Sequence, residues 1–181
     1  MKKIVLTYGL ISGAILTAMM AITFPFHDQI GFDRGVYVGY ATMVAAFMMV
    51  YFGVVSYRDN VAGGTVTFGR ALTVGLLISL ITMACYVVIW EVVYYNFMPG
   101  YLDQYTVYAL EQARLAGKTA EEIAAQAKEM KDFAEMYKNP LVNIAFTLLE
   151  PLPVAIVFTL VTAGITSRKR VPQGKAVAAV L

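Results

Sequence analysis

Hydrophobic residues fill four long stretches of the chain, and charged residues are largely confined to the segments between them. A helix needs about 20 predominantly apolar residues to cross the hydrocarbon of a bilayer. Each stretch is long enough; residues 4–26, 35–57 and 71–90 carry no charge, and residues 139–167 carry only Glu150. The pattern therefore predicts an all-α, polytopic membrane protein with four transmembrane helices. We place these helices at about residues 4–26, 35–57, 71–95 and 140–167.

The segment between the third and fourth predicted helices, about residues 100–138, is longer and more polar than the other connections. Gly117 is suited to end a helix covering about residues 102–115. Thr119 precedes Glu122 by three residues, which is the spacing of a capping box. The apolar residues that follow lie on one face of a helix, at Ile123, Ala127, Met130, Ala134 and Tyr137. We expect an external, amphipathic helical hairpin that rests on the membrane surface or covers the bundle; a partner-binding helix is the alternative.

Basic residues flank the predicted spans mainly on one side of the membrane. That side carries eight basic residues and one acid, Asp59, whereas the segment 96–138 is net acidic. Lysine and arginine are enriched in cytoplasmic loops. Both termini and the 58–70 loop are therefore predicted to be cytoplasmic, and residues 96–138 external. The eight basic residues are Lys2, Lys3, Arg58, Arg70, Arg168, Lys169, Arg170 and Lys175.

The composition agrees with this pattern and leaves no room for a separate soluble domain. Of the 181 residues, 59% are hydrophobic and 14% are charged, against about 25% charged residues in an average soluble protein. We expect one membrane domain over residues 1–170, followed by a short cytoplasmic tail over residues 171–181. The single cysteine, Cys85, excludes an intrachain disulfide.

Small residues in the first three spans have the spacing of close helix–helix contacts. Gly9 with Gly13, and Gly35 with Gly39, form G-x-x-x-G pairs, and Gly75 begins a similar small-residue pair. Apolar side chains gain little by leaving lipid, so small residues that let two backbones approach closely favour association of helices. We expect these faces to join helices of the same chain. A homo-oligomer, or contact with another membrane protein, is the alternative.

Glu150 is the residue in the hydrophobic stretches that most favours a functional role. An ionised carboxylate is costly inside a bilayer, so this side chain should face the bundle, be protonated or have a partner. Pro151 and Pro153 follow directly and cannot donate backbone hydrogen bonds, so they should bend or open the helix beside the acid.

Glu91 and His27 are expected near the outer level of Glu150, because each lies at the outer end of a predicted span. The functional interpretation is a proton- or ligand-responsive site, in which Glu150 binds a proton or a cationic group and Glu91 or His27 tunes its pKa. The structural interpretation is that a tyrosine hydroxyl, or backbone groups freed at the prolines, satisfies Glu150. In that case Glu91 lies at the membrane interface without a role in binding.

The sequence argues against an enzyme and against a nucleic-acid-binding protein. A single histidine excludes the H-E-x-x-H zinc motif and ligation of a redox cofactor by paired histidines, and no G-x-S-x-G motif is present. Gly63 and Gly64 open a glycine-rich loop that lacks the Gly-Lys-Ser/Thr ending of a phosphate-binding loop, so a tight turn is expected. The basic residues are accounted for by topology. We expect no cofactor, no metal site, no catalytic residue, and the lipid bilayer as the main partner.

Several sequence features occur together along most of the chain. They are the Lys2-Lys3 start before a glycine-bearing span, the run Tyr51–Arg58 leading to Gly63-Gly64 and Phe68-Gly69, and the third span opening from Ala71 to Gly75. With its long segment before a last span that ends in basic residues, the chain resembles a family of bacterial membrane proteins known as domain of unknown function 4199. The resemblance implies four helices and the bacterial inner membrane, but no activity. We therefore expect a structural or accessory membrane protein; the alternative is a small proton-coupled transporter or membrane sensor that uses Glu150.

Overall fold

The computed structural model describes residues 1–168, and within that range the chain forms helices and no strands. The all-α fold class is therefore confirmed. The tail predicted over residues 171–181 lies outside the described residues. The elements are α1 (Lys2–Thr23), the 3-10 turn η1 (Phe24–Phe26), α2 (His27–Asn60), α3 (Phe68–Phe97), α4 (Tyr101–Leu115), α5 (Ala120–Tyr137), α6 (Pro140–Leu149) and α7 (Leu152–Thr166).

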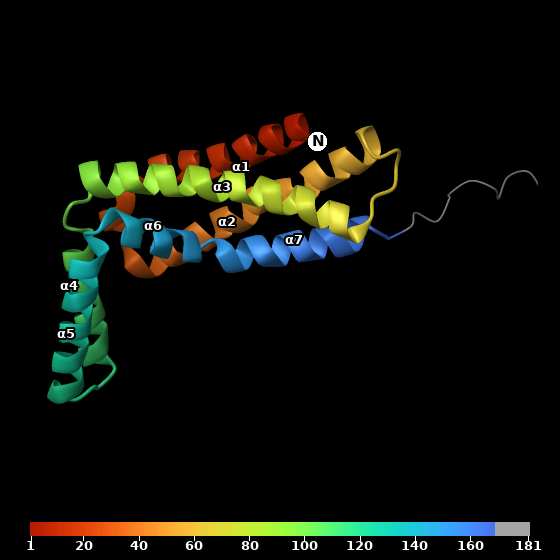
Figure 1. Ribbon diagram of the computed structural model, residues 1–181. Coiled ribbons are helices and arrows are strands. Elements are labelled where there is room, and N and C mark those ends of the chain that lie inside the picture. Colours follow the sequence, from red (N-terminus) through yellow and green to blue (C-terminus); the bar gives the residue numbers. More distant parts are fainter. Residues whose placement is uncertain (169–181) are drawn as a thin grey trace, which may run out of the picture.

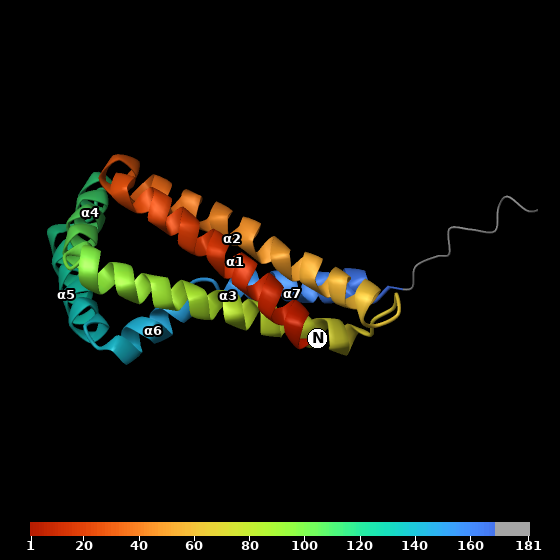
Figure 2. The same cartoon turned by 90° about the horizontal axis from the view of Figure 1, so that it is seen from above.

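Four helices, α1, α2, α3 and α7, run side by side as one elongated bundle (Figures 1 and 2). The short helix α6 precedes α7 and packs against α3. At one end of the bundle, α4 and α5 form a helical hairpin that turns steeply away from the bundle axis (Figure 1). The start of α1, the loop at residues 61–67 and the end of α7 all lie toward the other end.

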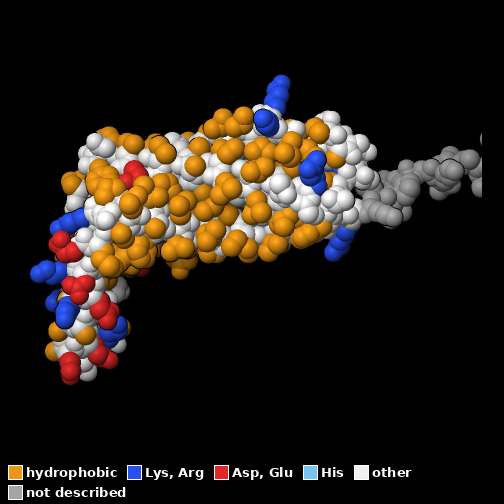
Figure 3. Space-filling view, in the orientation of Figure 1, with side chains coloured by type: hydrophobic (Ala, Val, Ile, Leu, Met, Phe, Trp, Pro, Cys, Tyr) orange, Lys and Arg blue, Asp and Glu red, His pale blue; other side chains and the backbone are white. Residues whose placement is uncertain are grey.

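Part of the bundle is long and apolar enough to cross a membrane. Two helical stretches meet this condition, Lys2–Asn60 and Phe68–Phe97, with mean hydropathies of 1.9 and 2.4, and the bent pair α6–α7 makes a third if it is one span. Hydrophobic side chains cover the face of the bundle seen in Figure 3, whereas charged side chains gather on the hairpin. Many large apolar side chains of the bundle point outward, among them Leu80, Val88 and Val157. These features are those of helices that face lipid.

The first two bundle helices are joined by a turn rather than by a loop. Pro25 lies in η1, and α2 begins directly at His27, ahead of the predicted start at residue 35. The backbone of α2 leaves the helical conformation only at Gly31, whose φ is 70°. Glycine adopts this left-handed region at little cost because it has no Cβ. The result is a kink in α2 near the hairpin end of the bundle.

The fourth hydrophobic stretch is two helices rather than one. Asn139 caps α6, since its Oδ1 accepts a hydrogen bond from the backbone N–H of Leu141 at 3.0 Å, and Pro140 occupies the first helical turn. The helix then breaks at Glu150 and Pro151, where α6 and α7 are bent by 41°. The break follows from the prolines, which lack the backbone donor that would continue the helical ladder.

Three of the predicted packing glycines lie at close contacts between helices. A Cβ built on Gly9 would come within 2.8 Å of Ile81, one on Gly13 within 2.6 Å of Cys85, and one on Gly75 within 3.0 Å of Thr159. No side chain fits at such distances without a shift, so the helices approach closely because these positions are glycine. The contacts join α1 to α3, and α3 to α7.

Gly35 and Gly39, for which we expected the same role, contact no neighbouring helix. A Cβ on either residue would meet no atom within 4 Å. The expected contact within the chain is absent among residues 1–168 because the kinked part of α2 lines a cavity here, and the homo-oligomer alternative stays a prediction. Gly53, which the G-x-x-x-G spacing does not mark, is tightly packed, with Ile78 at 2.4 Å from a Cβ and Tyr8 at 3.1 Å.

Buried hydroxyl groups add hydrogen bonds between the bundle helices. Ser12 Oγ donates to the backbone oxygen of Ala46 at 2.7 Å, which joins α1 to α2. Ser79 Oγ and Thr159 Oγ1 lie 3.1 Å apart and join α3 to α7. All three side chains are almost fully buried. Such bonds hold helices together where the surrounding medium offers no water.

The helical hairpin has the local structure that its sequence predicts. Gly117 has a φ of 76° after the end of α4, and Thr119 and Glu122 form the capping box at the start of α5. Glu122 accepts a hydrogen bond from the backbone N–H of Thr119 at 2.7 Å, which lowers the pKa of the Glu122 carboxyl below its usual value. Tyr137, the last residue of the predicted apolar face, is buried, while the charged face of α5 is exposed.

The glycine contact at Gly13 should be necessary for stability. We expect Gly13→Ala to lower the unfolding free energy by about 1–3 kcal/mol, because the added Cβ overpacks the contact with Cys85. The measurement is the thermal melting temperature of the purified protein in detergent. The control is Gly164→Ala in α7, where a Cβ meets no neighbour within 4 Å; it should be neutral or stabilising by up to about 1 kcal/mol from helix propensity. Equal effects of the two variants would contradict the packing argument, and Cys85→Gly should partly rescue Gly13→Ala.

Candidate functional site

A cavity of about 630 Å³ lies at the hairpin end of the bundle. Its walls come from the end of α1, the first half of α2, one face of α3 and the start of α4. Glu150, at the break between α6 and α7, also lines it. The cavity therefore exists where the four elements separate near the kink in α2, beyond the tightly packed glycine contacts.

Glu150 is held in the cavity wall by one hydrogen bond. The hydroxyl of Tyr86 in α3 donates to Oε2 of Glu150 at 2.6 Å. Within residues 1–168 no group donates to the second oxygen, Oε1, and no lysine, arginine or histidine forms an ion pair with this carboxylate. The glutamate side chain is exposed rather than enclosed in the packed bundle. The tyrosine hydroxyl expected by the structural interpretation is thus present, and it leaves half of the carboxylate unpaired.

Aromatic rings form much of the cavity wall. Phe32 of α2 lies against three tyrosines of α4, with ring centroids 5.8 Å from Tyr101, 5.4 Å from Tyr105 and 5.1 Å from Tyr108. Trp90 of α3 meets Tyr101 edge-on at 5.3 Å. Burial, with a smaller contribution from the charge of Glu150, raises the pKa of the Tyr101 phenol to about 12. Tyr101 is therefore a neutral phenol at physiological pH.

His27 and two aspartates lie along the same cavity. The Nε2 atom of His27 is 3.0 Å from Oδ1 of Asp28, and its Nδ1 atom is 3.2 Å from the backbone oxygen of Phe24. The hydroxyl of Tyr108 donates to Asp33, and this bond raises the pKa of the Tyr108 phenol. The structure thus brings His27 and Glu150 to one cavity, as the proposed polar cluster requires, although no contact joins the two side chains.

Glu91 does not belong to this cavity. It lies on another face of α3, beside a hydrogen-bonded chain that runs from Trp90 Nε1 to the Tyr137 hydroxyl at 3.0 Å, then to Thr147 at 3.3 Å and to Asn143 Oδ1 at 3.1 Å. Burial raises the pKa of the Tyr137 phenol, and the charge of Glu91 adds to the rise. Two buried polar atoms, Glu91 Oε1 and Asn143 Nδ2, have no hydrogen-bond partner among the described residues. This chain joins α3, α5 and α6; it meets the cavity at Trp90, but no hydrogen bond joins it to Glu150 among the described residues.

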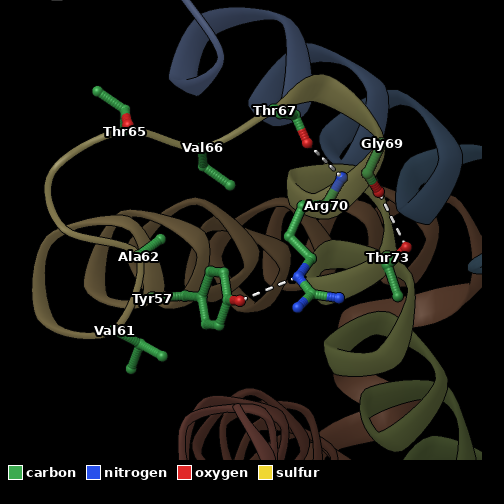
Figure 4. A pocket seen from close by; sticks show the side chains of 9 residues that line it. All are labelled: Tyr57, Val61, Ala62, Thr65, Val66, Thr67, Gly69, Arg70 and Thr73. Atoms are coloured by element: carbon green, nitrogen blue, oxygen red, sulfur yellow. Dashed lines mark hydrogen bonds between the residues drawn. The ribbon is translucent and has the colours of Figure 1, made fainter.

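A second cavity, of about 660 Å³, lies at the opposite end of the bundle around the 61–67 loop (Figure 4). Its one basic side chain, Arg70, donates from Nε to the hydroxyl of Tyr57 at 3.1 Å. Arg58 pairs with Asp59 at 2.7 Å. Gly63 and Gly64 both have positive φ, so the loop is the tight turn that the sequence predicts. Nothing in this cavity resembles a phosphate-binding loop.

The chain matches a family described as "Protein of unknown function (DUF4199)" over residues 7–168. It belongs to this family. Comparison with curated proteins and with solved structures gives no match. The DUF4199 family has no assigned function, so what the cavity does must be argued from its residues. Across the part of the DUF4199 chain that the structure describes, no group of three or more His, Cys, Asp or Glu side chains is placed to hold a metal ion.

Sequence reasoning missed the aromatic wall of this DUF4199 protein, although its signal is visible. Tyr101, Tyr105 and Tyr108 follow the i, i+4, i+7 spacing that places residues on one helical face. Tyr86 and Trp90 are also four residues apart on α3, so they share a face that meets the cavity. The spacing shows that the residues of each set share a helical face. It does not show which other helix that face meets, because this depends on the tertiary arrangement.

Tyr137 should be important for attaching the hairpin to the bundle. We expect Tyr137→Phe to lower the unfolding free energy by about 1–3 kcal/mol, because Trp90 Nε1 would be left without its hydrogen-bond acceptor in a mostly buried site. Thermal melting followed by the fluorescence of Trp90, the single tryptophan, measures the loss. The control is Tyr95→Phe, since Tyr95 is exposed and no hydrogen bond joins its hydroxyl to the described residues. The network argument fails if both variants melt like the parent protein.

Proposed function

We propose that this chain is a four-span, non-enzymatic integral membrane protein that binds a small ligand in its cavity from the outer side of the membrane. Its role would be accessory or sensory rather than catalytic. The observation that carries the proposal is the half-paired carboxylate of Glu150 in the wall of an aromatic cavity. A span with only a structural role has no need of an acid at this position, because an ionisable group inside a membrane is costly.

The way in which the longest hydrophobic stretch folds supports four spans. The stretch Lys2–Asn60 reverses direction at η1, and α1 packs along α2 over most of its length. This reversal supports two crossings rather than one. With α3 as the third and the bent pair α6–α7 as the fourth, the number of crossings is even, which fits the position of the start of α1 and the end of α7 toward the same end of the bundle (Figure 1).

The basic residues orient these four spans. The end of the bundle that holds Lys2, Arg58 and Arg70 would be cytoplasmic by the positive-inside rule, which makes the α4–α5 hairpin external. We propose the bacterial inner membrane as the location, in keeping with the family resemblance. The lipid bilayer is then the main partner, since it covers the outward-facing apolar side chains of the bundle.

The packing below the cavity favours binding over transport. Phe47, Val50 and Ile78 are completely buried in the part of the bundle beyond the cavity. Close packing of this kind leaves no path for a solute toward the cytoplasmic end. The cavity is also a poor candidate for catalysis by a hydroxyl nucleophile, because its two threonines, Thr23 and Thr42, donate to backbone oxygens of their own helices rather than to a base. Because transport and catalysis are both disfavoured, we propose recognition of a ligand from outside.

The topology can be tested by cysteine labelling in a Cys85→Ala background. We expect Lys118→Cys, in the α4–α5 turn, to react with a membrane-impermeant maleimide added outside intact cells, and Thr65→Cys to react only after the membrane is opened. Both side chains are exposed in loops, so access depends on the side of the membrane. Thr65 is preferred to Gly63, whose positive φ disfavours any other residue. Labelling of Thr65→Cys from outside would overturn the orientation.

The cavity itself can be tested with Gly39→Cys in the same background. A side chain at residue 39 meets no atom within 4 Å and lines the cavity, so it should react with a small, charged thiosulfonate added from outside. The matched control is Ile78→Cys, which replaces a fully buried residue and should stay unreactive in folded protein. If Gly39→Cys is as inert as Ile78→Cys while Lys118→Cys reacts, the cavity is not open to small molecules and the proposed function is wrong.

A further inference from the structure

We infer that the ligand of this cavity is a small organic cation, an amine or quaternary ammonium group carried on an apolar body. The inference rests on the proposed function and specifies the chemistry of the ligand. It is based on the charge of the cavity, the aromatic side chains that line it, and its size. The source is taken to be a free solute on the outer side rather than a lipid.

The first argument is the missing counter-charge of Glu150. Its Oε2 accepts the hydroxyl of Tyr86, while Oε1 has no donor and no cation among residues 1–168 lies within ion-pair distance. Tyr86 also orients the carboxylate, because its phenol is fixed in α3 next to the cavity. A carboxylate held in this way and left half open is complementary to a positively charged group.

The second argument is the aromatic wall. Trp90, Tyr101 and Phe32 line the same cavity as Glu150, and the first two rings meet edge-on at 5.3 Å. The faces of aromatic rings carry negative potential, so they attract cations and repel anions. Quaternary ammonium groups are recognised in proteins by such sets of rings. The raised pKa of Tyr101, to about 12, means that this ring offers a neutral phenol.

The third argument is the charge along the rest of the cavity. Asp28 and Asp33 accompany Glu150, against one arginine, Arg34, and His27. Arg34 and the three acids are exposed, and His27 is beside Asp28 at 3.0 Å. The lining is therefore net acidic, which disfavours a free anion.

The size of the cavity favours a small solute over a lipid. A volume of about 630 Å³ falls within the range of roughly 300–1,000 Å³ found for sites that enclose drug-sized molecules. A single aromatic or short aliphatic amine fits this space together with some water. A two-chain lipid would have to leave its tails outside, and its phosphate would approach the carboxylate of Glu150.

Three matched probes test the charge preference, with Trp90 fluorescence in the purified, nanodisc-embedded protein as the readout. Benzyltrimethylammonium is the cation, benzyl alcohol the neutral analogue and phenylacetate the anion. We expect the cation to bind at least about ten-fold more tightly than either of the other probes. A difference of this size in affinity is what one ion pair with the cavity would contribute. Equal binding of the three probes, tighter binding of phenylacetate, or displacement of the cation by added phospholipid overturns the inference.

Variants of the cavity give a second, independent measurement. Glu150→Gln should weaken cation binding by about ten-fold or more and leave benzyl alcohol unchanged, whereas Glu121→Gln, an exposed acid at the start of α5, should change neither. Tyr101→Leu should weaken cation binding several-fold while Tyr101→Phe, which keeps a ring, should not. If Glu150→Gln melts at a lower temperature than the parent, the Tyr101 pair decides the question.

The outcomes separate this inference from the proposed function. If Gly39→Cys reacts from outside but the cation shows no preference, the cavity is open to small molecules without selecting cations, and only the inference is wrong. If Gly39→Cys is inert and no probe binds, the proposed function fails as well. Binding of the cation that Glu150→Gln and Tyr101→Leu leave unchanged also overturns the inference, because it would occur elsewhere on the protein.

Discussion

The close approach of α1 to α3 at Gly9 and Gly13 is the contact on which the arrangement of the bundle depends. Helices surrounded by lipid gain little from burying apolar side chains, so they associate through close backbone contact and shared hydrogen bonds. Gly53 and Gly75 extend this contact to α2 and α7, and the hydroxyls of Ser12 and Ser79 add hydrogen bonds. The glycine contacts and hydroxyl hydrogen bonds thus hold the helices together mainly away from the hairpin. The helices separate where these contacts end. The cavity occupies that separation.

The break between α6 and α7 gives the cavity its charge. In a continuous helix, the regular helical repeat would set the direction of each side chain in this region. The two prolines instead interrupt the backbone hydrogen bonds of the helix, and Glu150 lies at the break between α6 and α7. The carboxylate meets Tyr86 there, while α6 continues toward the Tyr137 network on the other side. One break between two apolar helices therefore places an acid beside a set of aromatic rings.

The sequence predicts well the features that depend on neighbouring residues. The capping box at Thr119, the start of α6 at Asn139 and the break after Glu150 all follow from local hydrogen-bonding rules, and all are found. Features that depend on the packing of one helix against another were predicted less well. Gly35 and Gly39 have the same spacing as Gly9 and Gly13 but line the cavity, and Glu91 lies one face away from the site it was expected to join. The bond between Tyr86 and Glu150 joins residues 64 positions apart, and no local pattern encodes it.

The hydrogen bond from Trp90 to Tyr137 has a mechanical consequence. Trp90 lines the cavity, and Tyr137 is the last residue of α5, so this bond joins the hairpin to the cavity wall, in addition to the bond from Tyr108 to Asp33. A load that tilts the hairpin must either break this bond or rotate the indole and change the shape of the cavity. The same bond works in the opposite direction, because a molecule that displaces the indole pulls on the root of the hairpin.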